Sequence, residues 1–441
     1  MWSLAGCLSG NESTESETSE AVVVIEFRAS LGLNERDEQI IRQFIGHATT
    51  FAVNLKAEAV AEKCRKHPEM FAWVEFNYLK CLNVAYELTG DTDYLDLLSD
   101  TFDANFKPIL GRGPDDYLGW YGSPITPRIP KDNPDIQIDE IQMNFRAIGM
   151  LAEWIELARE DGAYAAKKKE VIDVYLELME KHLFPKWDER GHFSLIEGRG
   201  GVYHGLDYPI KGGVTLSHEK LSIIVDACLR LYRVTGNDLY MQRALLVGQW
   251  FKSCLTEVDG HYEWMSWVPA GEWDRDSSKE NGLKISWVAP DPNSQWYVSA
   301  LSIALNLYQY GLLFSEEDLK RFVQTQKTMC WNGDVENPEY RNVAGHKNEW
   351  VKGRFLSYQI APYDATLTQL AFYGPHEEEV EAKADSSWQG GANGRSYIVQ
   401  KYLMQPLVKG AKQPFTSIGL KFLKQKKNQA FLKELTYPAD E

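Results

Sequence analysis

Acidic residues near the expected starts of helices are the first candidates for chemistry in this chain of 441 residues. Asp139 and Glu140 precede an apolar helical pattern, Asp364 follows a proline where another helix is expected to begin, and Glu349 lies beside a tryptophan. A pair of carboxyl groups can cleave a glycosidic bond, because one donates a proton to the leaving oxygen while the other attacks or activates water. The helix-start acids would also stabilise a helix N-terminus without any catalytic role.

Histidine and tyrosine side chains offer a competing chemistry. Tyr203 and His204 lie in a glycine-rich loop near Arg199. A base, an acid and a cation of these types would suit a lyase that removes the proton next to a uronate carboxylate. His218 with His346 would suit an epimerase, which removes a proton and returns it. A histidine in a loop can equally serve as a simple hydrogen-bonding residue.

Aromatic residues are abundant in the long connections, and the whole chain contains 14 Trp and 22 Tyr. Rings in loops offer flat apolar faces that stack on sugar rings, so they predict a carbohydrate ligand. Core packing is the alternative role for part of them. The candidates for contact with substrate are Tyr203, His346, Trp120, Tyr121, Trp264, Trp267, Trp273 and Trp287.

A repeated helical turn organises the elements that must position these residues. In residues 79–95, apolar residues recur every three or four positions up to a turn with Tyr86, Gly90 and Asp91, and Tyr232 and Gly236 recur at the same spacing in residues 225–241. Glycine can take the left-handed conformation that ends a helix, and aspartate caps the helix that follows. Looser copies turn near residues 162 and 311. Such repeats predict helical hairpins that bury their apolar faces by stacking.

The periodicity predicts about twelve helices. Eleven of them cover residues 34–67, 69–88, 91–106, 135–159, 163–183, 215–234, 238–255, 293–313, 315–329, 362–372 and 377–384, and the twelfth begins near residue 396. Tight turns alternate with long connections at 108–134, 184–214, 256–292 and 330–361. Long loops in compact proteins are usually functional. We therefore expect the active face at the N-terminal ends of the helices that follow the long connections.

This alternation and the repeated Leu-Thr-Gly-Asp turn resemble the (α/α)6 toroid of six-hairpin carbohydrate-active enzymes, over roughly residues 35–410. These enzymes include glycoside hydrolases, polysaccharide lyases and N-acylglucosamine epimerases. Residues 138–143 are similar to the acidic helix start of unsaturated uronyl hydrolases, and residues 216–221 are placed like a histidine motif of the epimerases. The resemblance implies an all-α fold with long functional loops on one face and a carbohydrate substrate.

Composition limits the partners. The net charge of -16 and the pI near 5.2 argue against nucleic acid or an anionic membrane surface, since phosphates are bound by clustered Lys and Arg. Six cysteines at irregular spacing form no zinc or redox motif, and no metal-binding motif is present, so neither metal nor cofactor is expected. No apolar run is long enough to span a bilayer.

The N-terminal segment predicts a lipid anchor. Residues 4–7, Leu-Ala-Gly-Cys, resemble the lipobox at which bacterial lipoproteins are cleaved and acylated, here on Cys7, and the polar run 9–20 resembles the tether that follows. Only three residues precede Leu4, so an ordinary disordered tail is the alternative. The motif predicts export to the periplasm or the cell surface, with membrane contact only through Cys7.

Together these features predict residues 1–20 as a disordered tether and residues 21–441 as one toroid domain. We expect a monomeric glycoside hydrolase that acts on an oligosaccharide or polysaccharide. A lyase or an epimerase on the same fold is the first alternative. A glycan-binding lipoprotein without catalytic acids is the second, and an open helical repeat that binds partner proteins is the third.

Overall fold

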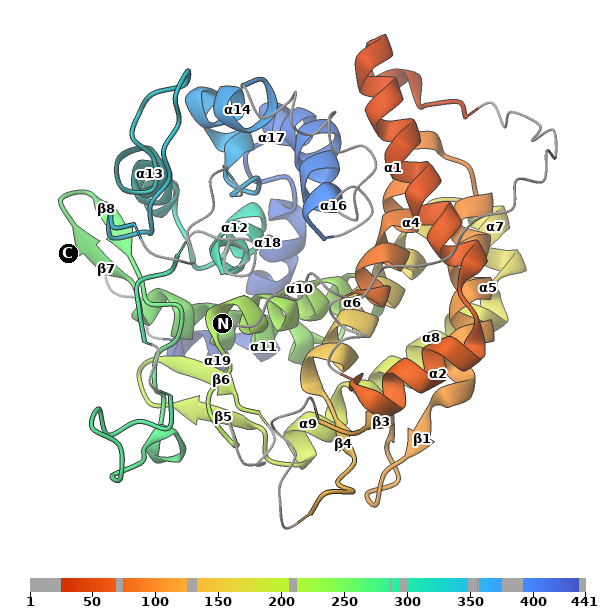
Figure 1. Cartoon of the computed structure of the whole chain (residues 1–441), viewed down its shortest axis with the longest axis horizontal. Helices are drawn as coiled ribbons and strands as arrows, with labels where there is room; N and C mark the ends of the chain where they lie inside the picture. Colours follow the sequence, from red (N-terminus) through yellow and green to blue (C-terminus); the bar gives the residue numbers. More distant parts are fainter. Residues whose placement is uncertain are drawn as a thin grey trace.

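A computed structural model describes residues 25–68, 74–124, 133–205, 212–285, 288–292, 300–347, 355, 357–374 and 392–435 (Figure 1). Helices make up most of these residues, and each small sheet has only two strands. The all-α class predicted from the sequence is therefore confirmed. None of the described helices combines the length and the apolar character needed to cross a membrane.

The helices fall into an N-terminal group, a central group and a C-terminal group. The N-terminal group is α1 (Glu35–Asn54), α2 (Ala57–Lys66), α4 (Glu75–Thr89) and α5 (Asp93–Asn105). The central group is α6 (Ile141–Ala158), α7 (Gly162–Lys167), α8 (Lys169–Leu178), α9 (Pro185–Glu189), α10 (His218–Thr235) and α11 (Asp238–Ser253). The C-terminal group is α12 (Leu301–Gln309), α13 (Glu316–Gln324), α14 (Ala365–Phe372), α16 (Ala392–Ile398), α17 (Gln405–Gly410), α18 (Thr416–Lys424) and α19 (Gln429–Glu434).

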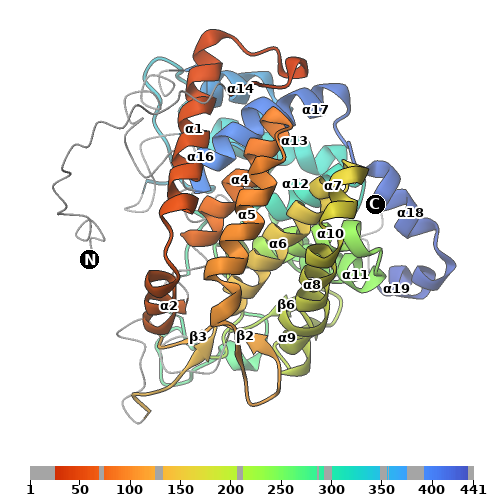
Figure 2. The same ribbon diagram turned by 90° about the vertical axis from the view of Figure 1, so that its right-hand side faces the viewer.

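Four antiparallel pairs of short strands, which the sequence did not predict, lie in the long connections, except that residues 138–139 form a strand where the helix predicted at 135–159 was expected to begin. The pairs join β1 (Gly111–Arg112) with β2 (Leu118–Gly119), β3 (Tyr121–Gly122) with β4 (Ile138–Asp139), β5 (Phe193–Ile196) with β6 (Gly200–Tyr203), and β7 (Thr256–Val258) with β8 (His261–Glu263). Figure 2 shows β2 and β3 at one end of the long helices α1, α4 and α5, which contact one another. The long connections therefore carry structure of their own.

The repeated turn has the same hydrogen bonds in both copies. Gly90 and Gly236 have φ values of 80° and 71°, and each donates its N–H to the carbonyl oxygen of the tyrosine four residues earlier, Tyr86 or Tyr232, at 2.7 Å. The threonine before each glycine donates to a carbonyl oxygen one turn back, also at 2.7 Å. The side chain of the residue after each glycine accepts an N–H at the start of the next helix. The predicted helical hairpin is confirmed at both sites.

Two predicted helices are each divided. The helix predicted at 34–67 is interrupted at Leu55 and Lys56, whose backbones are extended, and the one predicted at 163–183 is interrupted at Lys168. Neither break contains proline or glycine, and the apolar spacing continues across both, so periodicity alone could not reveal them. The helix predicted at 377–384 lies outside the described residues.

Six helices form a series in which each is linked to the next, and a short helix that precedes α14 makes the link between α12 and α14. Helix α4 contacts α6, α6 contacts α10, and α10 contacts α12. Tyr308 of α12 packs against Tyr363, which lies in the short helix η6 (Ala361–Tyr363) just before α14. Phe372 of α14 packs against Tyr397 of α16, and α16 contacts α4. The first and the last helix of the series are therefore neighbours.

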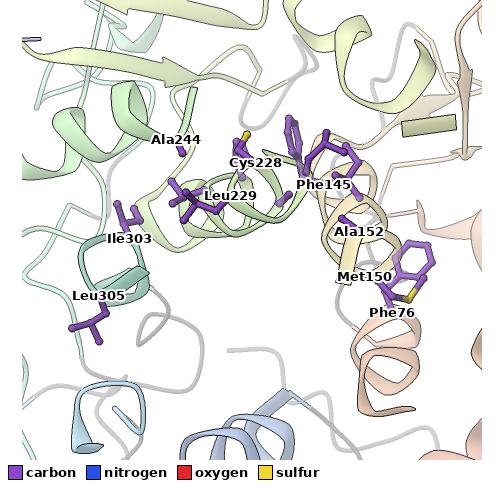
Figure 3. Close-up of a cluster of buried hydrophobic side chains, with 14 of the residues drawn as sticks. Phe76, Phe145, Met150, Ala152, Cys228, Leu229, Ala244, Ile303 and Leu305 are labelled. Carbon is purple, nitrogen blue, oxygen red and sulfur yellow. The ribbon is translucent and has the colours of Figure 1, made fainter. Parts of the chain in front are cut away.

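Buried apolar side chains fill the spaces between these helices (Figure 3). Phe145 of α6 and Cys228 of α10 lie where those two helices meet, and Leu229 lies on the side of α10 that faces α11 and α12. These positions belong to one large hydrophobic cluster. The helices are therefore held by their apolar faces, which leaves other faces available for polar residues.

Candidate functional site

Asp139 lies in a buried cluster of charges. Its Oδ2 accepts from Lys186 Nζ at 2.5 Å and from Arg190 at 3.2 Å, and its Oδ1 accepts from Asn144 at 2.7 Å. Only 2% of the Asp139 side chain and none of the Lys186 side chain is exposed. Arg190 also donates to Asp115 at 2.6 Å and to the hydroxyl of Tyr121 at 3.1 Å. The contacts of Asp139 are those of a structural ion pair between β4 and α9, and its catalytic role stays a prediction.

Glu140 is the N-cap of α6. Its carboxylate accepts the backbone N–H of Gln142 at 2.7 Å and the side-chain amide of Gln142 at 3.2 Å. Asp364 has the same position at α14, where it accepts from the backbones of Thr366 and Leu367 and pairs with Lys327 at 3.2 Å. The capping role that the sequence allowed for both residues is therefore present.

Tyr203 and His204 do not form an exposed acid and base. The Tyr203 hydroxyl is fully buried and donates to Asp188 at 3.0 Å, and Arg243 also pairs with Asp188. The His204 ring is half-buried, with ring contacts to His192 and Trp273. Burial lowers the pKa of His204 and that of His192. A tyrosine enclosed in this way has no exposed surface for a substrate, which argues against the lyase alternative.

His218 and His346 occupy unlike surroundings. The His218 ring is buried against Phe251 of α11, and neither ring nitrogen has a hydrogen-bond partner among the described residues. Burial lowers the pKa of His218 to about 3, so the ring is neutral. His346 is exposed in the connection after α13. No contact joins the two rings in the described part of the chain, so the epimerase pair gains no support.

The aromatic candidates divide into core and partly exposed rings. Trp120, Trp264 and Trp267 are buried, and their indole nitrogens donate to Phe106, Asp291 and Thr215, respectively. These three rings are nearly or fully buried, so their surroundings do not support the expected contact with a sugar, which stays a prediction. Trp273 and Tyr121 keep partial exposure. Trp287 and Glu349 lie outside the described residues.

A different set of polar residues lies where the successive helices meet. We define the axial polar cluster as Lys80 of α4, Arg146 and Glu153 of α6, Asp226 and Arg230 of α10, and Arg395 of α16. Arg146, Glu153 and Glu156 are the only charged residues of α6, and their spacing of seven and three places them on one face. Lys80 and Asp226 are joined at 3.2 Å. The stripe is present in the sequence, but none of its residues was among the candidates predicted from the sequence.

Ion pairs connect three helices within the axial polar cluster. Arg230 pairs with Glu153 at 2.8 Å and with Asp226 at 3.0 Å, so it links α6 and α10. Asn83 of α4 donates to Glu153 at 3.2 Å. A Cβ atom at Gly149 of α6 would lie 3.2 Å from Lys80 Nζ and 3.3 Å from Asp226 Oδ2. The glycine therefore allows α6 to approach the Lys80–Asp226 pair closely.

Asp226 is the most exposed of the four residues that these ion pairs join, followed by Arg230, whose side chain is 19% exposed. The Asp226 side chain is 31% exposed, compared with 7% for Lys80 and 6% for Glu153. Burial is the largest influence on the pKa of Asp226 and would raise it, but Arg230, Lys80 and Arg395 together lower the pKa. Asp226 is therefore an ionised carboxylate that protein surrounds and solvent still reaches.

Arg146 connects the network to the N-terminal ends of α6 and α10. Burial and the nearby charge of Arg395 lower the pKa of Arg146 to about 10, while Glu219, Asp226 and Glu140 oppose that shift. Glu140 precedes the first residue of α6, and Glu219 is the second residue of α10. The charges of two carboxylates at adjacent helix starts therefore both raise the pKa of Arg146. Glu219 was not a candidate in the sequence, although it directly follows His218.

The described residues contain neither a cluster of metal ligands nor a cysteine with a lowered pKa. No three side chains of His, Cys, Asp or Glu gather there in a way that could hold a metal ion. The described cysteines form no disulfides. Burial raises the pKa of Cys64 to about 12 and that of Cys254 to about 11, so both thiols stay protonated.

Comparison with known proteins leaves the family open. No protein-family model matches the chain, and no curated protein matches it either.

Proposed function

We propose that this chain is a glycoside hydrolase that acts on an oligosaccharide or polysaccharide from the interior of an (α/α)6 toroid. The succession of contacts from α4 to α16, and from α16 back to α4, supports a closed ring of inner helices. An open repeat that binds partner proteins would leave its terminal helices apart. The resemblance of the sequence to six-hairpin enzymes supports the same arrangement.

The observation that carries the proposal is the axial polar cluster. Removing a charged group from water costs several kcal/mol, and packing alone would favour apolar residues at these positions. Arg146 and Glu153 nevertheless lie on a helix whose other residues are mostly apolar and buried. Perturbed charged groups held together inside a protein are a common feature of active sites. We therefore place the site among α4, α6, α10 and α16.

The proposed chemistry uses Glu140 and Glu219. In a hydrolase, one carboxyl group protonates the leaving oxygen while the other attacks the sugar or activates water. Glu140 and Glu219 are the carboxylates at the starts of two adjacent helices, and both influence Arg146. The two hydrogen bonds from Gln142 hold Glu140 in a fixed orientation. This pair keeps one of the acids expected from the sequence and replaces Asp139 with Glu219.

Asp226 has a supporting role in this mechanism. Cleavage of a glycosidic bond passes through a transition state with positive charge on the sugar. An ionised carboxylate in a poorly solvated place stabilises such a charge more strongly than water does. The ion pairs with Lys80 and Arg230 keep Asp226 ionised. We therefore expect Asp226 to contribute electrostatically rather than by proton transfer.

A panel of neutral, uronate-containing and sulfated oligosaccharides tests the reaction class. The wild-type protein is incubated with each sugar, and three products are measured: new reducing ends, the ultraviolet absorbance of an unsaturated uronate, and an epimerised sugar. The proposal predicts new reducing ends without the absorbance. The Glu140→Gln variant should lose this activity, and Glu58→Gln, a matched change on the exposed face of α2, should keep it.

The other outcomes would replace the proposal. An absorbance rise would indicate a lyase, and an epimerised product without new ends would indicate an epimerase. Binding without any product would support a glycan-binding protein. Export through Cys7 stays a separate prediction, because residues 1–24 lie outside the described part of the chain.

A further inference from the structure

The axial polar cluster contains more cations than its carboxylates neutralise. Lys80 pairs with Asp226, and Arg230 pairs with both Asp226 and Glu153. The other two cations, Arg146 and Arg395, form no ion pair among the described residues. The cluster therefore has two arginines without carboxylate partners.

Arg395 has the fewest contacts of the four cations. It makes neither a hydrogen bond nor an ion pair within the described residues, and its Nε is buried without a partner. The guanidinium group of Arg146 donates to the side-chain oxygen of Asn77 at 3.0 Å, but its Nε is also buried without a partner. Buried donors without acceptors are rare in proteins, and each one is unfavourable. Both arginines thus have donors for which the described residues supply no acceptor.

The helices that carry these two arginines, α6 and α16, both contact α4, which carries Lys80. Burial is the largest influence on the pKa values of Lys80, Arg146 and Asp226, and the charge of Arg395 lowers all three. Like charges that share a poorly solvated place repel each other, and an anion placed between them removes the repulsion. Guanidinium groups suit carboxylate and sulfate groups because two parallel N–H donors match two oxygens.

We propose that Arg146 and Arg395 bind the acidic group of a charged sugar, so that the substrate is an acidic glycan. The sugar part of this inference rests on the proposed function, whereas anion binding does not. The chain as a whole carries a net charge of -16 and should repel anions at most of its surface. Arg146 and Arg395 form a local exception, which would select an acidic group and position it beside Glu219 and Asp226.

Calorimetric binding tests this inference with four forms of the full chain. They are the wild type, Arg395→Gln, Arg395→Lys and Arg275→Gln, a matched change at an exposed arginine. The ligands are a uronate-containing, a sulfated and a neutral oligosaccharide of equal length. Arg395→Gln should weaken binding of the acidic ligand by about tenfold to a hundredfold and leave the neutral ligand unchanged. Arg395→Lys should recover part of the affinity, and Arg275→Gln should bind as the wild type does.

The ligand panel separates the two possible anions. Preference for the uronate sugar identifies a carboxylate, and preference for the sulfated sugar identifies a sulfate ester. Because Arg395 has no partner in the described chain and its buried donor is unfavourable, its loss should not lower the melting temperature, and circular dichroism checks this.

Two results separate this inference from the proposed function. Equal binding of acidic and neutral sugars by wild type and Arg395→Gln would overturn the anion site, even if the protein hydrolyses neutral glycans. Selective binding of acidic sugars that Arg395→Gln loses, without cleavage by the wild type, would support the anion site and reject the hydrolase.

Discussion

Lys80 of α4 and Asp226 of α10 form an ion pair of 3.2 Å beside Gly149 of α6. The pair therefore joins two helices that lie on either side of α6, both of which contact it. A side chain larger than hydrogen at position 149 would meet both charged groups, so the close packing of three helices depends on this glycine.

Replacing Gly149 with alanine should destabilise the protein. The new methyl group would lie 3.2 Å from Lys80 Nζ and 3.3 Å from Asp226 Oδ2, so the pair must shift. Overpacking of this kind costs about 1–3 kcal/mol, partly offset by the helix propensity of alanine. Gly46→Ala in α1 is the matched control, because no atom lies within 4 Å of its new methyl group. Denaturant unfolding should show Gly149→Ala as less stable than Gly46→Ala, and equal stability would contradict the packing described for α6.

Asp139→Asn should affect stability more than chemistry. The change leaves the fully buried Lys186 without its closest carboxylate, and breaking such a pair costs about 3–5 kcal/mol. We expect a lower free energy of unfolding and, at a temperature where the variant is folded, nearly wild-type kcat. A variant that folds as stably as the wild type but has lost its activity would return Asp139 to the catalytic role expected from the sequence.

Glu87 of α4 should make stability depend on pH between about 4.5 and 8. Burial, and then the charge of Glu153, raises the pKa of Glu87 from 4.5 to about 8. A carboxyl group with a raised pKa contributes stability below about pH 4.5 that is lost as the pH rises through about 8. Glu87→Gln, which resembles the protonated form, should therefore raise the melting temperature by a few degrees above pH 8 and have little effect in acid. If the melting temperatures of the wild type and of Glu87→Gln fall in parallel as the pH rises, the raised pKa of Glu87 would be contradicted.

His218 should make stability depend on pH in the acidic range. Its pKa is lowered from 6.5 to about 3 by burial, so the unfolded chain binds a proton between these values and the folded chain does not. The contribution of the neutral His218 ring to the free energy of unfolding is complete above about pH 6.5 and is lost as the pH falls toward 3. His218→Leu should flatten the loss of stability below pH 6.5 while hydrolysis continues. Loss of all activity in a folded His218→Leu protein would instead support a histidine mechanism.

Local features of the fold could be predicted from the sequence because they depend on near neighbours. The turn at Gly90 and its copy at Gly236 rest on hydrogen bonds within a few residues, and both are present. The breaks at Leu55 and Lys168 were missed because apolar spacing continues through them. Tertiary packing decides such breaks, and periodicity does not report it.

The candidate site was harder to predict because its contacts are distant in sequence. Asp139 resembled a catalytic acid by its position before a helix, but Lys186 and Arg190, which neutralise it, follow about 50 residues later. Trp120 lies in a predicted loop but packs between Phe76 and Phe102. The charged stripe of α6 was visible, yet its meaning depended on α4 and α10 lying beside it. Spacing alone could not distinguish a solvated face from an internal one.

The rate of glycoside hydrolysis by Glu219→Gln tests the central claim most directly. The wild type, Glu219→Gln and the surface control Glu58→Gln are compared on the best substrate of the panel, with circular dichroism to confirm that each is folded. General acid or base catalysis contributes about a hundredfold to ten-thousandfold, so Glu219→Gln should lose that much of kcat while Glu58→Gln keeps it. A folded Glu219→Gln protein with wild-type kcat would contradict the proposed carboxylate pair.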